Sequence, residues 1–135
     1  MSGCHELLQL VSGARLLIVE DDAALAQMLS LDFQERGYHV RLAGSVRQAR
    51  RILSDWCFDL LLLDDHLPDG RGIELLEVCR SRLPTLGVVL SSAQTGHEGL
   101  HAMACGRGRF VPKPATAETL EQAFRELWSP GRNVD

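Results

Sequence analysis

Residues 59–70 read DLLLLDDHLPDG, and this stretch decides the fold. Four consecutive leucines at 60–63 form an apolar run of strand length, which is typical of a strand buried on both faces of a parallel sheet. Asp64 and Asp65 follow directly, and the Leu-Pro-Asp-Gly sequence at 67–70 predicts a turn. We therefore expect a central strand whose carboxyl end carries acidic side chains.

Short apolar runs alternate with amphipathic segments on both sides of this strand. The other expected strands are 15–19, 39–43, 87–90 and 109–111, and the expected helices are 23–36, Ser45 to Leu53, Ile73 to Cys79, 97–105 and 116–128. Strict alternation of this kind predicts an α/β fold, with a doubly wound, five-stranded parallel sheet between two layers of helices, five in all. The runs at 15–19 and 60–63 are the most apolar, so we place them side by side in the centre.

Length and composition limit the class of protein. The chain has 135 residues, of which 45% are hydrophobic and 24% charged, as expected for one soluble globular domain. The net charge of −4 argues against general binding to a nucleic acid backbone, and no apolar run is long enough to span a membrane. The first 14 residues contain Glu6 and lack a basic start, so they make a poor signal peptide, and we expect a cytoplasmic protein.

Three of the four cysteines lie in apolar segments, and we expect them to be small core residues. The spacing of the four includes no Cys-x-x-Cys pair, so neither a zinc site nor a redox motif is predicted.

Polar side chains follow four of the expected strands. Because the carboxyl ends of parallel strands meet at one edge of the sheet, these side chains are expected to gather there. Lys113 is the single lysine of the chain, whereas arginine occurs 13 times. The residues are Glu20, Asp21 and Asp22 after the first strand, Asp64 and Asp65 after the third, Ser91 and Ser92 at the fourth, and Lys113 after the fifth.

This set of residue types favours phosphoryl chemistry. Carboxylates that lie close together repel one another, and a divalent cation with oxygen ligands, above all Mg²⁺, relieves the repulsion. An aspartate beside Mg²⁺ and a lysine is a competent nucleophile toward a phosphoryl group. We assign this chemistry to Glu20, Asp21 and Asp64 with Lys113, and expect Asp22, Asp65 and Asp69 to be solvated or to cap helices.

Four motifs together resemble the receiver domains of response regulators, the CheY-like family. They are LLIVEDD (16–22), DLLLLDDHLPDGRGIELL (59–76), VVLSSA (88–93) and FVPKP (110–114). Each motif is weak alone, but their order and spacing are highly specific, and the resemblance covers residues 15–128. It implies a flavodoxin-like three-layer sandwich with strand order 2-1-3-4-5, an N-terminal extension at 1–14, the receiver domain at 15–129 and a tail at 130–135.

The resemblance also implies roles for single residues. Glu20 and Asp21 become the acidic pair that binds Mg²⁺ together with Asp64, which is the expected phosphoacceptor. The other implied roles fall to the backbone carbonyl of His66 as a further Mg²⁺ ligand, to Ser92 as the switch hydroxyl, to Lys113 as the phosphate contact and to Phe110 as the switch aromatic.

A receiver domain of this kind is a signalling module of two-component His-Asp systems. The resemblance implies that a histidine kinase or a histidine phosphotransfer protein phosphorylates it and that the new state changes binding to a downstream output domain or protein. Catalysis would be limited to its own phosphoryl transfer and dephosphorylation, and no binding to nucleic acid or membrane is implied. A homodimer is implied through the face formed by 97–105, 109–111 and 116–128, although Gly99 weakens the first of these helices.

Three other functions remain open from the residues. An aspartyl-phosphate phosphatase of the dehalogenase type needs a second Asp two positions after its nucleophile, and Ala24 stands there after Asp22. A flavin binder needs a phosphate loop after the first strand, where EDDAAL would repel phosphate. A pseudo-receiver would act only as a scaffold. The chain could be a single-domain regulator or a part of a longer one, since seven residues follow Trp128.

Overall fold

The computed structural model describes residues 13–82, 86–93 and 108–127, and these form a five-stranded parallel sheet. The strand order is β2-β1-β3-β6-β7, which confirms the predicted arrangement with the first and third strands adjacent in the centre. The strands are β1 (Arg15–Val19), β2 (His39–Ala43), β3 (Leu60–Asp64), β6 (Gly87–Ser92) and β7 (Gly108–Pro112).

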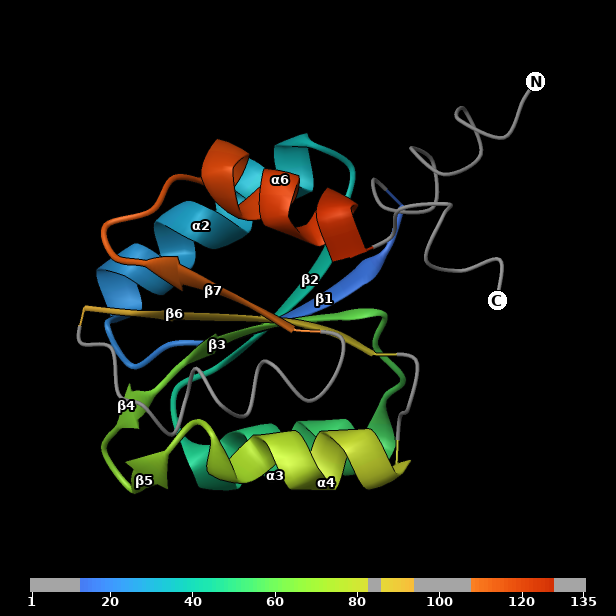
Figure 1. The fold of residues 1–135 in the computed structure, drawn as a ribbon, viewed down its shortest axis with the longest axis vertical. Coiled ribbons are helices and arrows are strands. Elements are labelled where there is room, and N and C mark those ends of the chain that lie inside the picture. The colour runs from blue at the N-terminus through green and yellow to red at the C-terminus, as the bar shows by residue number, and fades with distance from the viewer. Residues whose placement is uncertain (1–12, 83–85, 94–107, 128–135) are drawn as a thin grey trace.

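Helices cover both faces of the sheet, as Figure 1 shows. On one face lie α2 (Ala23–Glu35) and α6 (Ala117–Leu127), and on the other lie α3 (Val46–Asp55) and α4 (Glu74–Arg82). The helix expected at 97–105 lies outside the described residues. The structure adds a short antiparallel hairpin after β3, which consists of β4 (His66–Leu67) and β5 (Gly70–Arg71) and encloses the expected turn.

Successive side chains of the central strands point to opposite faces of the sheet, and this divides the core into two clusters. In β1, Leu17 and Val19 pack with the cluster beneath α3 and α4, whereas Leu16 and Ile18 pack with the cluster beneath α2 and α6. All four are at most 1% exposed, because a strand with helices on both faces has no solvent side. This is why the sequence of such a strand is apolar throughout.

Side-chain caps fix where two of the helices begin. The carboxylate of Asp22 accepts a hydrogen bond from the Leu25 amide at 3.1 Å, and the hydroxyl of Ser45 accepts one from the Gln48 amide at 3.1 Å. Asp69 also serves a helix start, because its carboxylate accepts from the first amides of α3. The expected capping roles of Asp22 and Asp69 are therefore confirmed.

Cys79 is buried in the core beneath α4, but Cys57 is exposed. Cys57 directly follows Trp56, the C-cap residue of α3, and lies in the loop to β3. None of the helices in the described ranges has both the length and the hydropathy that a membrane crossing requires.

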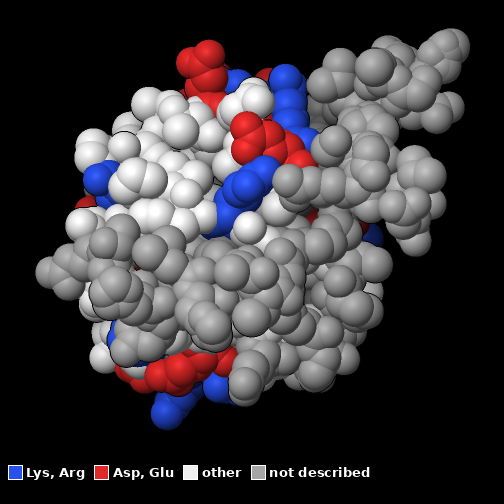
Figure 2. Space-filling model, viewed as in Figure 1, with Lys and Arg blue, Asp and Glu red and all other residues white. Residues whose placement is uncertain are grey.

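On the face seen in Figure 2, the coloured acidic and basic side chains lie next to one another, as is usual for a solvated surface.

Candidate phosphorylation site

Three carboxylates meet at the carboxyl edge of the sheet. Glu20 and Asp21 directly follow β1, and Asp64 is the last residue of β3, the strand paired with β1. One carboxylate oxygen from each lies within 4.8 Å of the other two. Glu20 and Asp64 are each 6% exposed, whereas Asp21 is exposed. Such a group of oxygen ligands fits a hard divalent cation, which would enter from the solvent side of Asp21.

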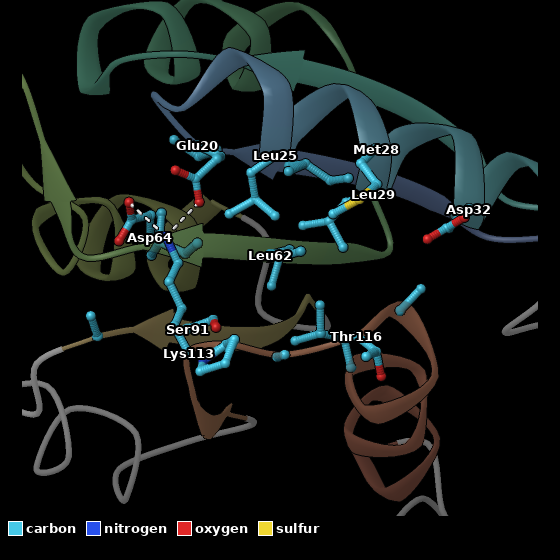
Figure 3. A pocket seen from close by; sticks show the side chains of 18 residues that line it. Glu20, Leu25, Met28, Leu29, Asp32, Leu62, Asp64, Ser91, Lys113 and Thr116 are labelled. Atoms are coloured by element: carbon cyan, nitrogen blue, oxygen red, sulfur yellow. Dashed lines mark hydrogen bonds and ion pairs between the residues drawn. The ribbon is translucent and has the colours of Figure 1, made fainter.

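Lys113, which directly follows the carboxyl end of β7, brings a positive charge to the same edge. Its ammonium lies 2.7 Å from Oε1 of Glu20 and 3.3 Å from Oδ2 of Asp64. Dashed lines mark both contacts in Figure 3. The amide of Lys113 donates to the carbonyl of Ser92 at 3.0 Å, which fixes the backbone beside β6. The structure thus brings together Glu20, Asp21, Asp64 and Lys113, as the strand ends predict.

The charges at this edge shift the pKa values of Glu20 and Lys113. Burial raises the pKa of Glu20, and the charge of Asp64 adds to this effect, while the hydrogen bond from Lys113 opposes it. Burial alone would lower the pKa of Lys113, but the hydrogen bond and charge of Glu20, together with Asp64, outweigh it and raise that pKa. Lys113 therefore stays charged at neutral pH, and it neutralises part of the acidic cluster.

The hydroxyl of Ser92 contacts the side chain of His66. Its Oγ lies 3.3 Å from Nδ1 of His66, which is exposed at the start of the β4–β5 hairpin. The amide of His66 donates to Oδ1 of Asp64 at 3.3 Å. Phe110 is half-buried in β7 and packs against the core cluster on the α3–α4 side.

Asp65, the neighbour of Asp64, has a different environment. Its carboxylate is paired with the guanidinium of Arg71 and accepts from the Ile73 amide at 3.2 Å, so it is directed into the hairpin. It is 2% exposed, so of the two expected roles, solvated group or helix cap, the first is wrong. The contact with the Ile73 amide, directly before the start of α4, is close to the second. No motif in the sequence predicts this pair, because Arg71 is one of many arginines.

An apolar pocket of about 660 Å³ adjoins the carboxylates, between α2 and α6 (Figure 3). Glu20, Asp64 and Lys113 form one end of the pocket. Its apolar part is lined by Leu25, Met28, Leu29, Leu62, Ala115 and Leu120. Met28 itself is 55% exposed, so apolar surface continues from the pocket onto α2.

Comparison with known proteins identifies the family to which these features belong. The response regulator receiver domain family matches residues 16–125. The chain belongs to this family. The transcriptional regulatory protein DpiA of Escherichia coli (strain K12) is 37% identical over 112 residues, which are 81% of this chain and 50% of DpiA. The chain thus spans about half the length of this relative, and it is a receiver domain of the kind found in two-component response regulators.

Solved receiver domains share the fold. The non-phosphorylated receiver domain of HemR from Leptospira biflexa matches with a TM-score of 0.76 and 30% identity, over 85% of this chain and 94% of that one. The response regulator TrrA from Thermotoga maritima, solved in complex with Mg²⁺-BeF, matches with a TM-score of 0.74 and 22% identity, over 84% of this chain and 97% of that one.

Proposed function

We propose that this receiver domain is phosphorylated on Asp64 and that a histidine kinase or a histidine phosphotransfer protein supplies the phosphoryl group. The observation that carries the proposal is the position of the Lys113 ammonium, which lies between two buried carboxylates of different strands, 2.7 Å from Glu20 and 3.3 Å from Asp64. Asp65 lacks this environment, because Arg71 and Ile73 occupy its carboxylate oxygens.

In the proposed reaction an Oδ oxygen of Asp64 attacks the phosphorus of the donor phosphohistidine. A P–O bond forms, the P–N bond breaks, and the electron pair returns to the imidazole nitrogen of the donor. Lys113 lies close enough to Asp64 to contact the incoming phosphoryl oxygens. A donor protein has to reach Asp64 from solvent, and the apolar pocket with exposed Met28 beside it offers surface for its side chains.

Mg²⁺ is the proposed cofactor, and the residues present fit it. Glu20, Asp21 and Asp64 supply three carboxylates close together, to which we add the backbone carbonyl of His66. The bound ion would supply positive charge beside the transferred phosphoryl oxygens. TrrA, which shares this fold, was solved with Mg²⁺-BeF, and this supports the assignment.

The response to phosphorylation is proposed to run through Ser92 and Phe110. The Ser92 hydroxyl would turn toward the phosphoryl group and vacate space between β6 and β7. Phe110 is half-buried and pairs with Leu90 of β6 in the register, so its ring could move into that space. A ring without a hydroxyl brings no unpaired polar group into the core. The changed surface would then bind an output domain or a downstream protein.

Phosphorylation is tested with acetyl phosphate and Mg²⁺ as a small phosphodonor. We expect the parent chain to gain one phosphoryl group, and Asp64→Asn to gain none, by intact-protein mass spectrometry. Asp65→Asn is the matched control, because it changes the neighbouring carboxylate and keeps one oxygen for the Ile73 amide. Labelling of Asp64→Asn to the level of the parent would show that the acceptor lies elsewhere.

Metal binding is tested with Asp21→Asn. We expect weaker Mg²⁺ binding, on the order of tenfold, because one of three carboxylates is lost. We also expect the metal-free variant to be more stable than the parent by a few tenths of a kcal/mol, roughly the value of one exposed charge pair, since repulsion with Glu20 and Asp64 is relieved. Calorimetric titration and urea unfolding measure the two effects, and a loss of metal-free stability would indicate a hydrogen-bonding role instead.

A further inference from the structure

The side chain of His66 reaches across the mouth of the site to a buried hydroxyl. Nδ1 of His66 lies 3.3 Å from Oγ of Ser92. His66 is exposed on the hairpin, whereas Ser92 is 1% exposed at the end of β6. The proposed phosphoryl transfer uses the backbone carbonyl of His66 and gives its imidazole no part.

We propose that His66 is a positioning residue whose Nδ1 accepts a hydrogen bond from the Ser92 hydroxyl and so holds that hydroxyl in its unphosphorylated position. This inference rests on the proposed function, because it requires Ser92 to turn toward a phosphoryl group on Asp64. A hydroxyl has one hydrogen to donate. Donation to Nδ1 of His66 and donation to a phosphoryl oxygen therefore exclude one another.

The backbone around Ser92 does not need to move in this exchange. The carbonyl of Ser92 accepts from the Lys113 amide at 3.0 Å, and the preceding residue, Ser91, lies opposite Asp64 in the pairing of β3 with β6. With the backbone fixed on both sides, rotation of the Ser92 side chain between staggered positions is the simplest change that redirects its hydroxyl. His66 therefore acts on the one torsion that the switch requires.

The contact makes phosphorylation compete with a hydrogen bond of the resting protein. When only a fraction of the protein is in the state that binds a ligand, the apparent affinity for that ligand falls in proportion to that fraction. A neutral hydrogen bond contributes little net free energy, so its removal should strengthen binding of a phosphoryl analogue by roughly two- to tenfold.

The test is a beryllofluoride titration at fixed Mg²⁺ and fixed pH, with the parent, His66→Phe and His66→Asn. His66→Phe keeps a ring but has no nitrogen, and we expect it to bind beryllofluoride about two- to tenfold more tightly. His66→Asn places an amide oxygen near the position of Nδ1, so we expect it to restore the affinity of the parent. The Mg²⁺ affinity without beryllofluoride should be the same in all three, because the proposed ligand is the backbone carbonyl.

A Ser92→Ala background completes a double-mutant cycle. Without the hydroxyl there is nothing for His66 to hold, so His66→Phe should no longer change the affinity for beryllofluoride. An effect of His66→Phe that persists in Ser92→Ala would overturn the proposal, because it would reflect access to the site. If His66→Phe with Ser92 intact binds beryllofluoride no more tightly than the parent does, the proposal is overturned as well.

Nitrogen NMR gives a readout that a purely structural role of His66 would not move. The Nδ1 resonance of His66 should shift when beryllofluoride is added, toward its position in Ser92→Ala. An unchanged resonance at saturation would contradict the proposal. Failure of the parent to bind beryllofluoride at all would refute the proposed function itself, so the two failures are distinguishable.

Discussion

Gly72 lies directly against the backbone of the proposed phosphoacceptor. A Cβ at this position would lie 2.2 Å from the carbonyl oxygen of Asp64, closer than any real contact of a Cβ atom. The amide of Gly72 also donates to the carbonyl of Asp65 at 2.8 Å, so a shift of the Gly72 backbone would strain this hydrogen bond. Gly72 is therefore required by close packing behind the site.

We expect Gly72→Ala to lower the free energy of unfolding by about 1–3 kcal/mol, since the hairpin must move away from Asp64. Gly44→Ala is the matched control, because a Cβ there would meet its nearest atoms, in Gln48 and Glu20, at 3.8 and 3.9 Å. The control should change stability by less than about 0.5 kcal/mol. Urea unfolding of both variants measures the difference, and equal stability would show that the loop relaxes freely.

The sequence predicts the charged residues of the site, but not the contacts that position the β4–β5 hairpin beside it. Glu20, Asp21, Asp64 and Lys113 end their strands, so the topology alone brings them to one edge. The orientation of the β4–β5 hairpin depends on individual contacts, such as the pair of Asp65 with Arg71. Pairs of this kind follow no periodicity, and only the folded chain shows them.

At the level of elements, the β4–β5 hairpin also determines how α3 begins. Asp69 accepts from the amides of Val46 at 2.8 Å and Arg47 at 2.9 Å, while Ser45 accepts from the Gln48 amide. Three of the amides that the first turn of a helix leaves unpaired are thus satisfied, two of them by a residue from another element. Local sequence predicts the Ser45 cap, but the contribution of Asp69 depends on the tertiary fold.

These two caps should differ in their dependence on pH. Hydrogen bonds from the amides of Arg47 and Val46 lower the pKa of Asp69. A carboxylate with a lowered pKa contributes stability that is fully present above its unfolded pKa, about 3.9, and is lost as the pH falls through the folded value. We expect Asp69→Asn to destabilise the chain at neutral pH, and this difference from the parent to shrink below about pH 4.

Ser45→Ala is the control without a titrating group, and it should cost about 1 kcal/mol at every pH at which the chain is folded. Unfolding curves collected from neutral to acid pH distinguish the two variants. A pH-independent effect of Asp69→Asn would show that its charge is irrelevant to the cap.

At the level of the whole molecule, the alternation of strands and helices in the sequence predicts the parallel sheet, its two helix layers and the central place of the first and third strands, whereas the full strand order is implied by the family resemblance. Leu16 and Leu17 are adjacent in sequence and belong to opposite clusters. The contacts that join helices within one layer are different, because they connect distant parts of the chain. Glu121 of α6 accepts hydrogen bonds from Tyr38 and Arg36, which follow α2 and lie more than 80 positions away in the sequence. No local pattern indicates such a pair.

The contact between Tyr38 and Glu121 gives the last prediction. The Tyr38 hydroxyl donates to Oε2 of Glu121 at 2.9 Å, and both residues are buried. Burial raises the pKa of Tyr38, and the hydrogen bond and negative charge of Glu121 raise it further. We expect Tyr38→Phe to lower the free energy of unfolding by about 1.5–3 kcal/mol at neutral pH, the usual value of a hydrogen bond to a charged group. The ring contact with Phe33, 5.0 Å between centroids, is retained in this variant.

The sign of the pH dependence follows from the raised pKa. A tyrosine whose folded pKa lies above the unfolded value of about 10 contributes stability that is complete below that value and is lost as the pH rises further. The parent should therefore lose stability above about pH 10 more steeply than Tyr38→Phe, and the two unfolding curves should converge. Both proteins share every other titrating group, so the difference between them isolates Tyr38. A difference that stays constant into the alkaline range would mean that the hydroxyl ionises as readily in the folded chain as in the unfolded one, and that the link between α2 and α6 is solvated.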